Sequence, residues 1–234
     1  GRCRQILDDL ADANAAASQG TVQVSGRLKI NAPLTFGNLH LAPLWGEFLK
    51  LYPQVELDIS LTDRLVDLVE EGYDLAVRIS SQADSSLVSR TLAHDQMVLC
   101  ASPHYLRQAA PINTLQDLAS HSVMAYSWWS GGDVWQLEDA LGGLHQVTIH
   151  PRLHANSGDT CRAAALADQG VIFQPAFLVG DDIRQGRLMR ILPDLHGPRI
   201  AIHVVYPSRK HLPGKVWAMA DFLAAAFQTP AWNL

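Results

Sequence analysis

The fold is indicated most clearly by residues 27–79, which read RLKINAPLTFGNLHLAPLWGEFLKLYPQVELDISLTDRLVDLVEEGYDLAVRI. Apolar side chains alternate along 28–32 and again along 55–61, and this two-residue period predicts strands. Between them, apolar residues at helical spacing predict a helix over 41–52. A second helix is predicted over 63–72, which begins with an Asp at the N-cap position and ends at a Gly. With the apolar strand that follows, the order is β-α-β-α-β, which predicts right-handed crossovers and a mostly parallel sheet.

The remainder of the chain repeats this alternation. Two strand ends resemble each other, because MVLCASPHYL and HVVYPSRKHL both run from apolar residues into Ser and Pro. If both are crossings between two lobes, the chain leaves the first lobe near Ala101 and returns near Tyr206. We therefore expect two Rossmann-like α/β lobes joined by two crossover strands, with 27–101 and 206–234 in lobe I and 102–205 in lobe II. The further predicted strands are 97–102, 122–126, 147–155, 171–175 and 200–208, and the further predicted helices are 114–121, 159–169 and 214–228.

Composition limits the class of protein. The chain has 234 residues, of which 48% are hydrophobic and 18% charged, as expected of a soluble globular protein. A formal net charge of -5 gives no broad basic surface, so these residues by themselves are expected to bind DNA poorly. The sequence has no long apolar run and no signal peptide at its start, so we expect no contact with a membrane. Three widely spaced cysteines predict a reducing compartment, and hence a cytoplasmic location.

Residues 1–26 are predicted to form a helix followed by a short linker. The helix carries a narrow apolar stripe, and two interpretations of it remain open: a seam for a partner helix, or an amphipathic helix packed on its own domain. The chain begins without Met and already inside this helical pattern, so we expect it to be a fragment whose N-terminal part is missing. The stripe consists of Cys3, Ile6, Leu10, Ala13 and Ala17.

The motifs of common enzyme classes are absent from the sequence. There is no GxSxG elbow, no GxxxxGK[ST] phosphate loop, no GxGxxG after a strand and no HExxH. His150 and His154 lie on a strand pattern that Pro151 interrupts. Four residues of strand separate the two rings by roughly 13 Å, which is too far for them to share one metal ion. We therefore expect no enzyme activity, no metal and no cofactor, although a hydrolase assembled from distant residues remains open.

Three stretches of the sequence resemble one known family. These are residues 26–79, residues 85–106, which read SSLVSRTLAHDQMVLCASPHYL, and residues 161–194, which read CRAAALADQGVIFQPAFLVGDDIRQGRLMRILPD. They resemble the effector-binding region of LysR-type transcriptional regulators, and the resemblance covers nearly the whole chain. It implies a fold of the periplasmic binding protein type II kind. It also implies that the opening helix is the end of a dimerising linker helix, and that an N-terminal winged helix-turn-helix is missing.

Two predicted helix starts are candidates for ligand contact in a cleft between the lobes. The first N–H groups of a helix lack partners within the helix and lie at the positive end of its dipole, so they can hold an anion. Asn156 and Ser157 precede such a start in lobe II, and Thr35 with Phe36 lies at another in lobe I. Ser157 and Thr35 could instead simply cap their own helices. The resemblance favours effector contact for Thr35, because the matching position in the family lies at the cleft.

Further candidates lie where predicted strands end. Thr62 follows one strand and could face the cleft or cap a helix. Arg78 ends another and could hold a carboxylate by two hydrogen bonds, or face solvent, or form an ion pair with a nearby Asp. Tyr126, Ser127 and Trp128 follow a lobe II strand, where aromatic rings could stack on a ligand or simply pack in the core. Adjacent tryptophans cannot both point inward from a strand, so Trp128 and its neighbour should differ.

The resemblance therefore predicts an effector-sensing domain of a DNA-binding regulator. We expect a small organic acid to bind between the lobes and to favour one lobe arrangement. The missing N-terminal domain would contact DNA, and the chain would assemble as a homodimer or tetramer. The alternative is an exported solute-binding receptor of the same architecture, which the missing signal peptide disfavours.

Overall fold

The computed structural model describes residues 24–80, 87–207, 212–230 and 232, so the helix predicted in residues 1–20 lies outside the described residues. One sheet of nine strands runs through the molecule in the order β2-β1-β3-β11-β4-β9-β5-β8, with β10 paired to β4. A separate two-stranded sheet consists of β6 and β7. The strands are β1 (Gly26–Ala32), β2 (Val55–Leu61), β3 (Leu75–Ser80), β4 (Val88–Ala101), β5 (Val123–Tyr126), β6 (Val134–Glu138), β7 (Leu144–Thr148), β8 (Leu153–Ala155), β9 (Val171–Pro175), β10 (Met189–Arg190) and β11 (Arg199–Tyr206).

The helices are mostly short and lie against this sheet. The first two α-helices are joined by a π-helical turn (Gly37–Leu41), and a 3₁₀ helix (Leu115–Ser120) precedes β5. The α-helices are α2 (Leu34–Phe36), α3 (Ala42–Leu51), α4 (Pro103–Gln108), α5 (Gly158–Leu166), α6 (Ala176–Arg184) and α7 (Gly214–Ala226). None of the helices in the described residues is long and apolar enough to cross a membrane.

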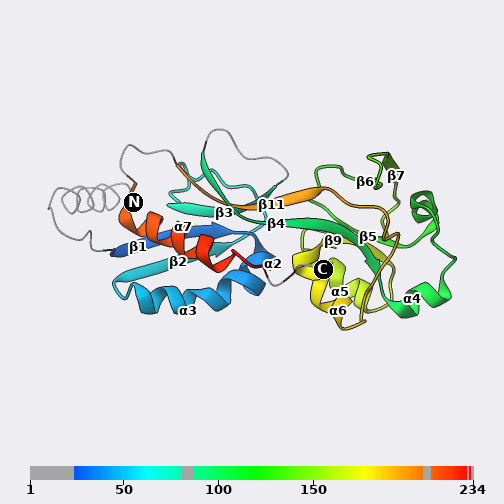
Figure 1. Cartoon of the computed structure of the whole chain (residues 1–234), viewed down its shortest axis with the longest axis horizontal. Coiled ribbons are helices and arrows are strands. Elements are labelled where there is room, and N and C mark those ends of the chain that lie inside the picture. The colour runs from blue at the N-terminus through cyan, green and yellow to red at the C-terminus, as the bar shows by residue number, and fades with distance from the viewer. Residues whose placement is uncertain (1–23, 81–86, 208–211, 231, 233–234) are drawn as a thin grey trace.

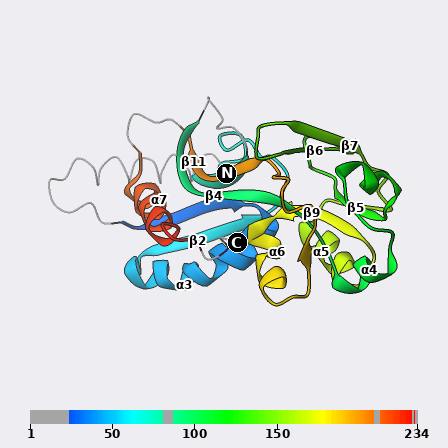
Figure 2. The same cartoon turned by 45° about the vertical axis from the view of Figure 1, so that its right-hand side comes forward.

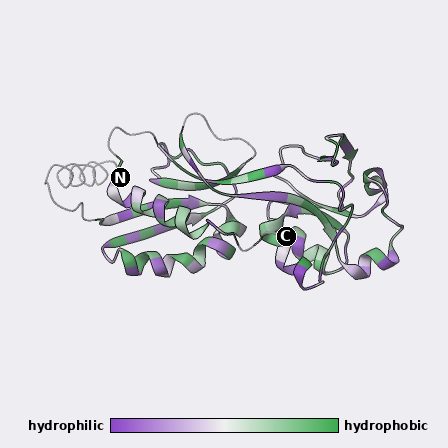
Figure 3. Ribbon diagram, viewed as in Figure 1, coloured by the Kyte–Doolittle hydropathy of each residue, from purple (hydrophilic) through white to green (hydrophobic). Residues whose placement is uncertain are grey.

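Lobe I is built from β1, β2, β3 and β11 with the first part of β4. As predicted from the sequence, β1 pairs in parallel with both β2 and β3. Helix α3 lies in the connection from β1 to β2, whereas a connection without a helix leads from β2 to β3. Alternate residues of β1 are fully buried at Leu28 and Ile30, which produces the two-residue apolar period. Phe48 of α3 packs edge-on against Phe222 of α7 with ring centroids 5.4 Å apart, so the two helices share one layer. Figure 3 shows hydrophobic and hydrophilic residues alternating along α3, as expected of a helix with one face on the core.

Lobe II contains the rest of the sheet. Strand β9 pairs antiparallel with β4 and parallel with β5, and β5 pairs in parallel with β8. Helices α5 and α6 pack beside one another against this part of the sheet, and the β6–β7 hairpin lies at the other side of lobe II (Figure 1). The sequence patterns did not predict α6, because its first five residues are all buried and leave it no polar face there.

The two lobes are joined along β4 and β11, which run between them in both views (Figures 1 and 2). Residues of β4 up to Gln96 pair with β11, whereas β9 and β10 pair with β4 from Met97 onward. Strand β11 begins at Arg199 and pairs with β4 through Tyr206, and with β3 from Ala201 to Val205. A change of partner within a continuous strand leaves the apolar pattern unbroken, so the sequence does not mark it.

The helix predicted over 63–72 is wrong. Residues 68–72 of this segment form turns and residues 63–67 no regular element, and its buried residues are Val66 and Leu68, two positions apart as in extended chain. The Asp67 carboxylate accepts hydrogen bonds at 2.9 Å from the N–H groups two and three residues later. Asp readily forms such local bonds, which compete with helix formation.

Candidate functional site

A cleft of about 1300 Å³ lies between the two lobes. Its walls come from the ends of β2 and β3 and from α2 in lobe I, and from the segment after β5, the β6–β7 hairpin and the starts of α5 and α6 in lobe II. Ligands of open α/β sheets bind beyond the carboxyl ends of the strands, and the cleft occupies that position for both lobes.

Six of the nine residues that the sequence analysis proposed line this cleft. The three others, Ser127, Asn156 and Ser157, are not among the lining residues, although Gly158 is. The six lining residues are Thr35, Phe36, Thr62, Arg78, Tyr126 and Trp128.

Thr35 makes a direct contact across the cleft. It is buried in α2, and its hydroxyl donates a hydrogen bond of 2.5 Å to Oδ2 of Asp159 in the first turn of α5. Its neighbour Phe36 is fully buried, and its ring meets that of Phe177 in α6 edge-on at 5.2 Å between centroids. Thr35 does not cap α2, which has no side-chain cap. Both residues therefore join lobe I to lobe II.

The start of α5 differs from the open anion site that the sequence suggested. The Ser157 hydroxyl accepts a hydrogen bond of 3.4 Å from the backbone N–H of Thr160, so Ser157 is the N-cap of its own helix. Asp159 adds a carboxylate to the first turn, where it interacts favourably with the helix dipole. Asn156 is exposed. Ser157 and Asp159 therefore stabilise the start of α5, and Gly158 is the residue of α5 that lines the cleft.

A second hydrogen bond joins the lobes at Tyr126. Its hydroxyl donates to Oδ2 of Asp63 at 2.9 Å, and the other oxygen of Asp63 accepts a bond of 2.8 Å from the N–H of Leu34. Burial and the neighbouring Asp63 carboxylate both raise the pKa of Tyr126, so the phenol stays protonated and remains a donor at physiological pH.

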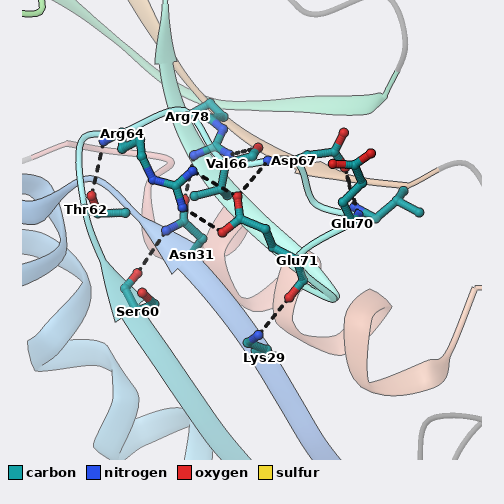
Figure 4. Close-up of polar contacts among 11 residues, drawn as sticks. Lys29, Asn31, Ser60, Thr62, Arg64, Val66, Asp67, Glu70, Glu71 and Arg78 are labelled. Carbon is teal, nitrogen blue, oxygen red and sulfur yellow. Dashed lines mark hydrogen bonds and ion pairs between the residues drawn. The ribbon is translucent and has the colours of Figure 1, made fainter. Parts of the chain in front are cut away.

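Arg78 lines the cleft while holding groups of lobe I. Its Nη1 donates to Oδ1 of Asn31 at 2.6 Å, and its Nη2 donates to the carbonyl oxygen of Val66 at 3.0 Å (Figure 4). The Thr62 hydroxyl accepts a bond of 3.2 Å from the N–H of Arg64, a local contact in the chain after β2, where residues 63–72 form no helix for Thr62 to cap. Arg78 thus orders the turn after β2 in addition to facing the cleft.

The two adjacent tryptophans point in different directions, as predicted. Trp128 is 53% exposed at the cleft, whereas the Trp129 ring packs edge-on against Phe173 with centroids 5.6 Å apart. Trp128 is therefore the ring available to stack on a bound molecule.

Some polar residues of the cleft were not found from the sequence. Gln174 interrupts the apolar strand β9, and this single polar residue was the available signal. The others lie at strand ends or in loops and carry no pattern. The polar lining residues missed in this way include Gln96, Gln174, His196 and Arg199.

A buried carboxylate lies beside the cleft at the junction of the lobes. Asp95 of β4 accepts hydrogen bonds from the N–H groups of Gln96, at 2.7 Å, and of Phe177 in the first turn of α6, at 2.9 Å. Burial raises the pKa of Asp95 to about 6, and these two hydrogen bonds act in the opposite direction. Asp95 therefore fixes α6 to the strand that connects the lobes.

No cluster of three His, Cys, Asp or Glu residues that could hold a metal ion occurs in the part of the chain that the structure describes. His154, which the sequence analysis had weighed as a ligand, instead lies 2.9 Å from Oδ1 of Asp133.

Comparison with known proteins identifies the family. The family model described as the LysR substrate binding domain matches residues 22–228. An uncharacterized HTH-type transcriptional regulator of Haemophilus influenzae is 35% identical over 215 residues, which are 92% of this chain and 74% of that protein. The HTH-type regulator YhjC of Escherichia coli is 31% identical over 228 residues, 97% of this chain and 76% of its own length.

Solved structures agree. The regulatory domain of CrgA, a LysR-type transcriptional regulator from Neisseria meningitidis, is 27% identical with a TM-score of 0.73, covering 87% of this chain and 99% of that one. The regulatory domain of AphB from Vibrio vulnificus is 26% identical with a TM-score of 0.71 over the same shares of the two chains. The chain therefore belongs to the LysR family of transcriptional regulators, and residues 22–228 form its effector-binding domain.

Proposed function

We propose that this domain binds a small organic acid between its lobes and transmits the binding to DNA-binding domains. The observation that carries the proposal is the cleft of about 1300 Å³, whose walls come from both lobes. A ligand held by both lobes binds one lobe arrangement more tightly than others, and this difference in affinity shifts the population.

Two hydrogen bonds set the arrangement on which such a ligand would act. Thr35 to Asp159 and Tyr126 to Asp63 join the lobes across the cleft. A ligand that competes for these groups, or adds to them, changes the free-energy difference between lobe arrangements by about the value of one hydrogen bond, about 1 kcal/mol each.

The organic-acid class rests on Arg78. Arg78 lines the cleft, and a planar guanidinium matches the geometry of a carboxylate. Trp128 offers an exposed ring for stacking on an apolar part of the same molecule.

The output of the domain is proposed from its relatives. The proteins reported above are named as HTH-type transcriptional regulators, so we propose that a winged helix-turn-helix joined to this domain contacts DNA in the cytoplasm. We further propose that the domain acts as a homodimer or tetramer, in which the lobe arrangement alters the spacing of the DNA-binding domains. These relatives favour neither an enzyme nor an exported solute-binding receptor.

A thermal-shift screen of small aliphatic and aromatic carboxylates tests the proposal. A ligand at 100 times its Kd stabilises the folded state by about 2.7 kcal/mol, which for a chain of this size raises Tm by about 5–10 °C. We expect Arg78→Gln to abolish the shift while retaining a donor for Asn31, whereas Arg27→Ala, which removes an exposed ion pair with Asp58, should leave it unchanged. The acid proposal is wrong if no carboxylate shifts Tm or if the shift survives in Arg78→Gln.

A further inference from the structure

The side chain of Gln174 is a buried amide without a complete set of partners. It lies on β9 in lobe II, is only 3% exposed, and lines the cleft. Its Nε2 has no hydrogen-bond partner among the described residues. A buried amide N–H without a partner costs free energy, so a partner supplied by a ligand recovers that cost.

The surroundings of this amide direct it toward the start of α5. A Cβ placed on Gly158 would lie 3.1 Å from Oε1 of Gln174 and 2.9 Å from Cδ2 of Leu178. Gly158 leaves just the space that the Gln174 amide fills beside the first turn of α5, and a side chain there would collide with it. Gln174, Gly158 and Leu178 all line the cleft, so the amide belongs to the cleft wall beside the start of α5.

Another unpartnered donor, Nε1 of Trp129, belongs to a different part of the wall. The Trp129 ring packs on Phe173, the neighbour of Gln174 on β9. Successive side chains of a strand point to opposite faces, so Gln174 faces away from this aromatic group, and its amide lies beside the start of α5.

We infer that Gln174 donates a hydrogen bond to an uncharged oxygen of the effector, such as a keto, amide or hydroxyl oxygen. The dipole of α5 favours partial negative charge at its start. A full negative charge is disfavoured there, because Asp159 follows Gly158 in the same turn and already carries a carboxylate. The effector group at this spot is therefore a neutral acceptor.

This inference rests on the proposed function and makes it more specific. Arg78 belongs to lobe I and Gln174 to lobe II, and both line the same cleft. A molecule whose carboxylate meets Arg78 and whose uncharged oxygen meets Gln174 contacts both lobes. The structure thus assigns the effector to organic acids that carry a second, uncharged hydrogen-bond acceptor.

Calorimetric titration with matched acids tests this assignment. The probes are hexanoate with 5-oxohexanoate, and 4-isopropylbenzoate with 4-acetylbenzoate, because the members of each pair have similar shapes and differ by one carbonyl oxygen. We expect the oxygen-bearing acid of at least one pair to bind the wild-type chain about tenfold more tightly than its partner.

Two variants separate recognition by Gln174 from a general effect on the cleft. Gln174→Leu keeps the approximate volume but removes the amide, and we expect the preference within the pair to fall to about twofold or less. Gly158→Ala places a methyl group against the Gln174 amide and should reduce the preference as well. Gln146→Leu, on the exposed face of β7 outside the cleft, is the control and should retain the tenfold preference.

The outcomes distinguish this inference from the proposed function. If the acids bind but the carbonyl oxygen brings no preference, or the preference persists in Gln174→Leu, the role of Gln174 is wrong and the acid effector stands. If neither member of either pair binds the wild-type chain, the acid effector is wrong and the role of Gln174 is wrong with it.

Discussion

Asp182 is the charged group whose removal should affect stability most. It is completely buried in α6, and two arginines donate to it. Both Nε and Nη2 of Arg162 in α5 bond to its carboxylate, the latter at 2.9 Å, and Nε of Arg187 donates to Oδ1 at 2.8 Å. The carboxylate therefore links α5, α6 and the turn that follows α6.

The expected loss of stability depends on how deeply Asp182 and its two arginine partners are buried. Removing one partner of a buried ion pair costs about 3–5 kcal/mol. The side chains of Arg162 and Arg187 are 29% and 49% exposed, so water partly compensates their charges after the change, and we expect Asp182→Asn to cost about 2 kcal/mol. For a domain of this size the loss corresponds to a Tm about 4–8 °C lower.

The pH dependence of the effect has a defined sign. Burial raises the pKa of Asp182, but the hydrogen bonds from Arg162 and Arg187 outweigh it, and the pKa lies below its ordinary value. The stabilisation is therefore complete above the unfolded-state pKa of about 4 and is lost as the pH falls through the lower folded-state pKa. The difference between wild type and Asp182→Asn should shrink in that acidic range.

Thermal unfolding followed by circular dichroism at pH 7 and at pH 3 measures both effects. Asp181→Asn is the matched control, because Asp181 is the preceding residue of α6 but is 72% exposed and pairs with the exposed Arg184. We expect this control to lower Tm by less than about 2 °C. The reasoning is refuted if Asp182→Asn lowers Tm no more than Asp181→Asn does.

Further predictions concern the junction of the lobes. Thr35→Val removes the donor to Asp159 and Tyr126→Phe the donor to Asp63, each a loss of about 1 kcal/mol, so hydrogen exchange of amides lining the cleft should become several-fold faster in each variant. Unchanged exchange in both would show that these bonds do not hold the lobes together. Burial raises the pKa of Asp95 to about 6, above its unfolded-state value, so the folded state binds the extra proton and stability falls by about 2 kcal/mol as the pH rises from 4 to 7. Asp95→Asn should flatten this part of the pH profile in urea unfolding, and a profile with the same slope as wild type contradicts the assignment.

Local sequence patterns predicted the elements that rest on simple periodicity. Strand β1 and the parallel pairing of β1 with β2 follow from alternating burial and from the helix between them. The helix prediction for residues 63–72 was wrong because their apolar residues also fit a helical period, whereas the Asp67 carboxylate bonds the backbone N–H groups just after it and forms a turn. Periodicity describes which residues are apolar and not which local hydrogen bonds form.

The candidate site was predictable in position but not in its contacts. Strand ends and helix starts in an α/β chain led to Thr35, Arg78 and Tyr126, which line the cleft. Nothing in the sequence indicated that Thr35 donates to Asp159, because the two residues lie in different lobes and are far apart along the chain. Gln174 stood out only as one polar residue in an apolar strand, and its unpartnered nitrogen became visible once its neighbours were placed.

The sequence by itself determined the α/β class, the order of most elements and the family, because these depend on the periodicity of burial and on motifs within short stretches. Tertiary structure alone decided where β4 exchanges partners, which groups bond across the cleft and which buried donors, Gln174 Nε2 among them, lack a hydrogen-bond partner. The physical reason is that hydrogen bonding and desolvation depend on atoms within a few ångströms in space, and the folded chain brings such atoms together from residues distant in sequence.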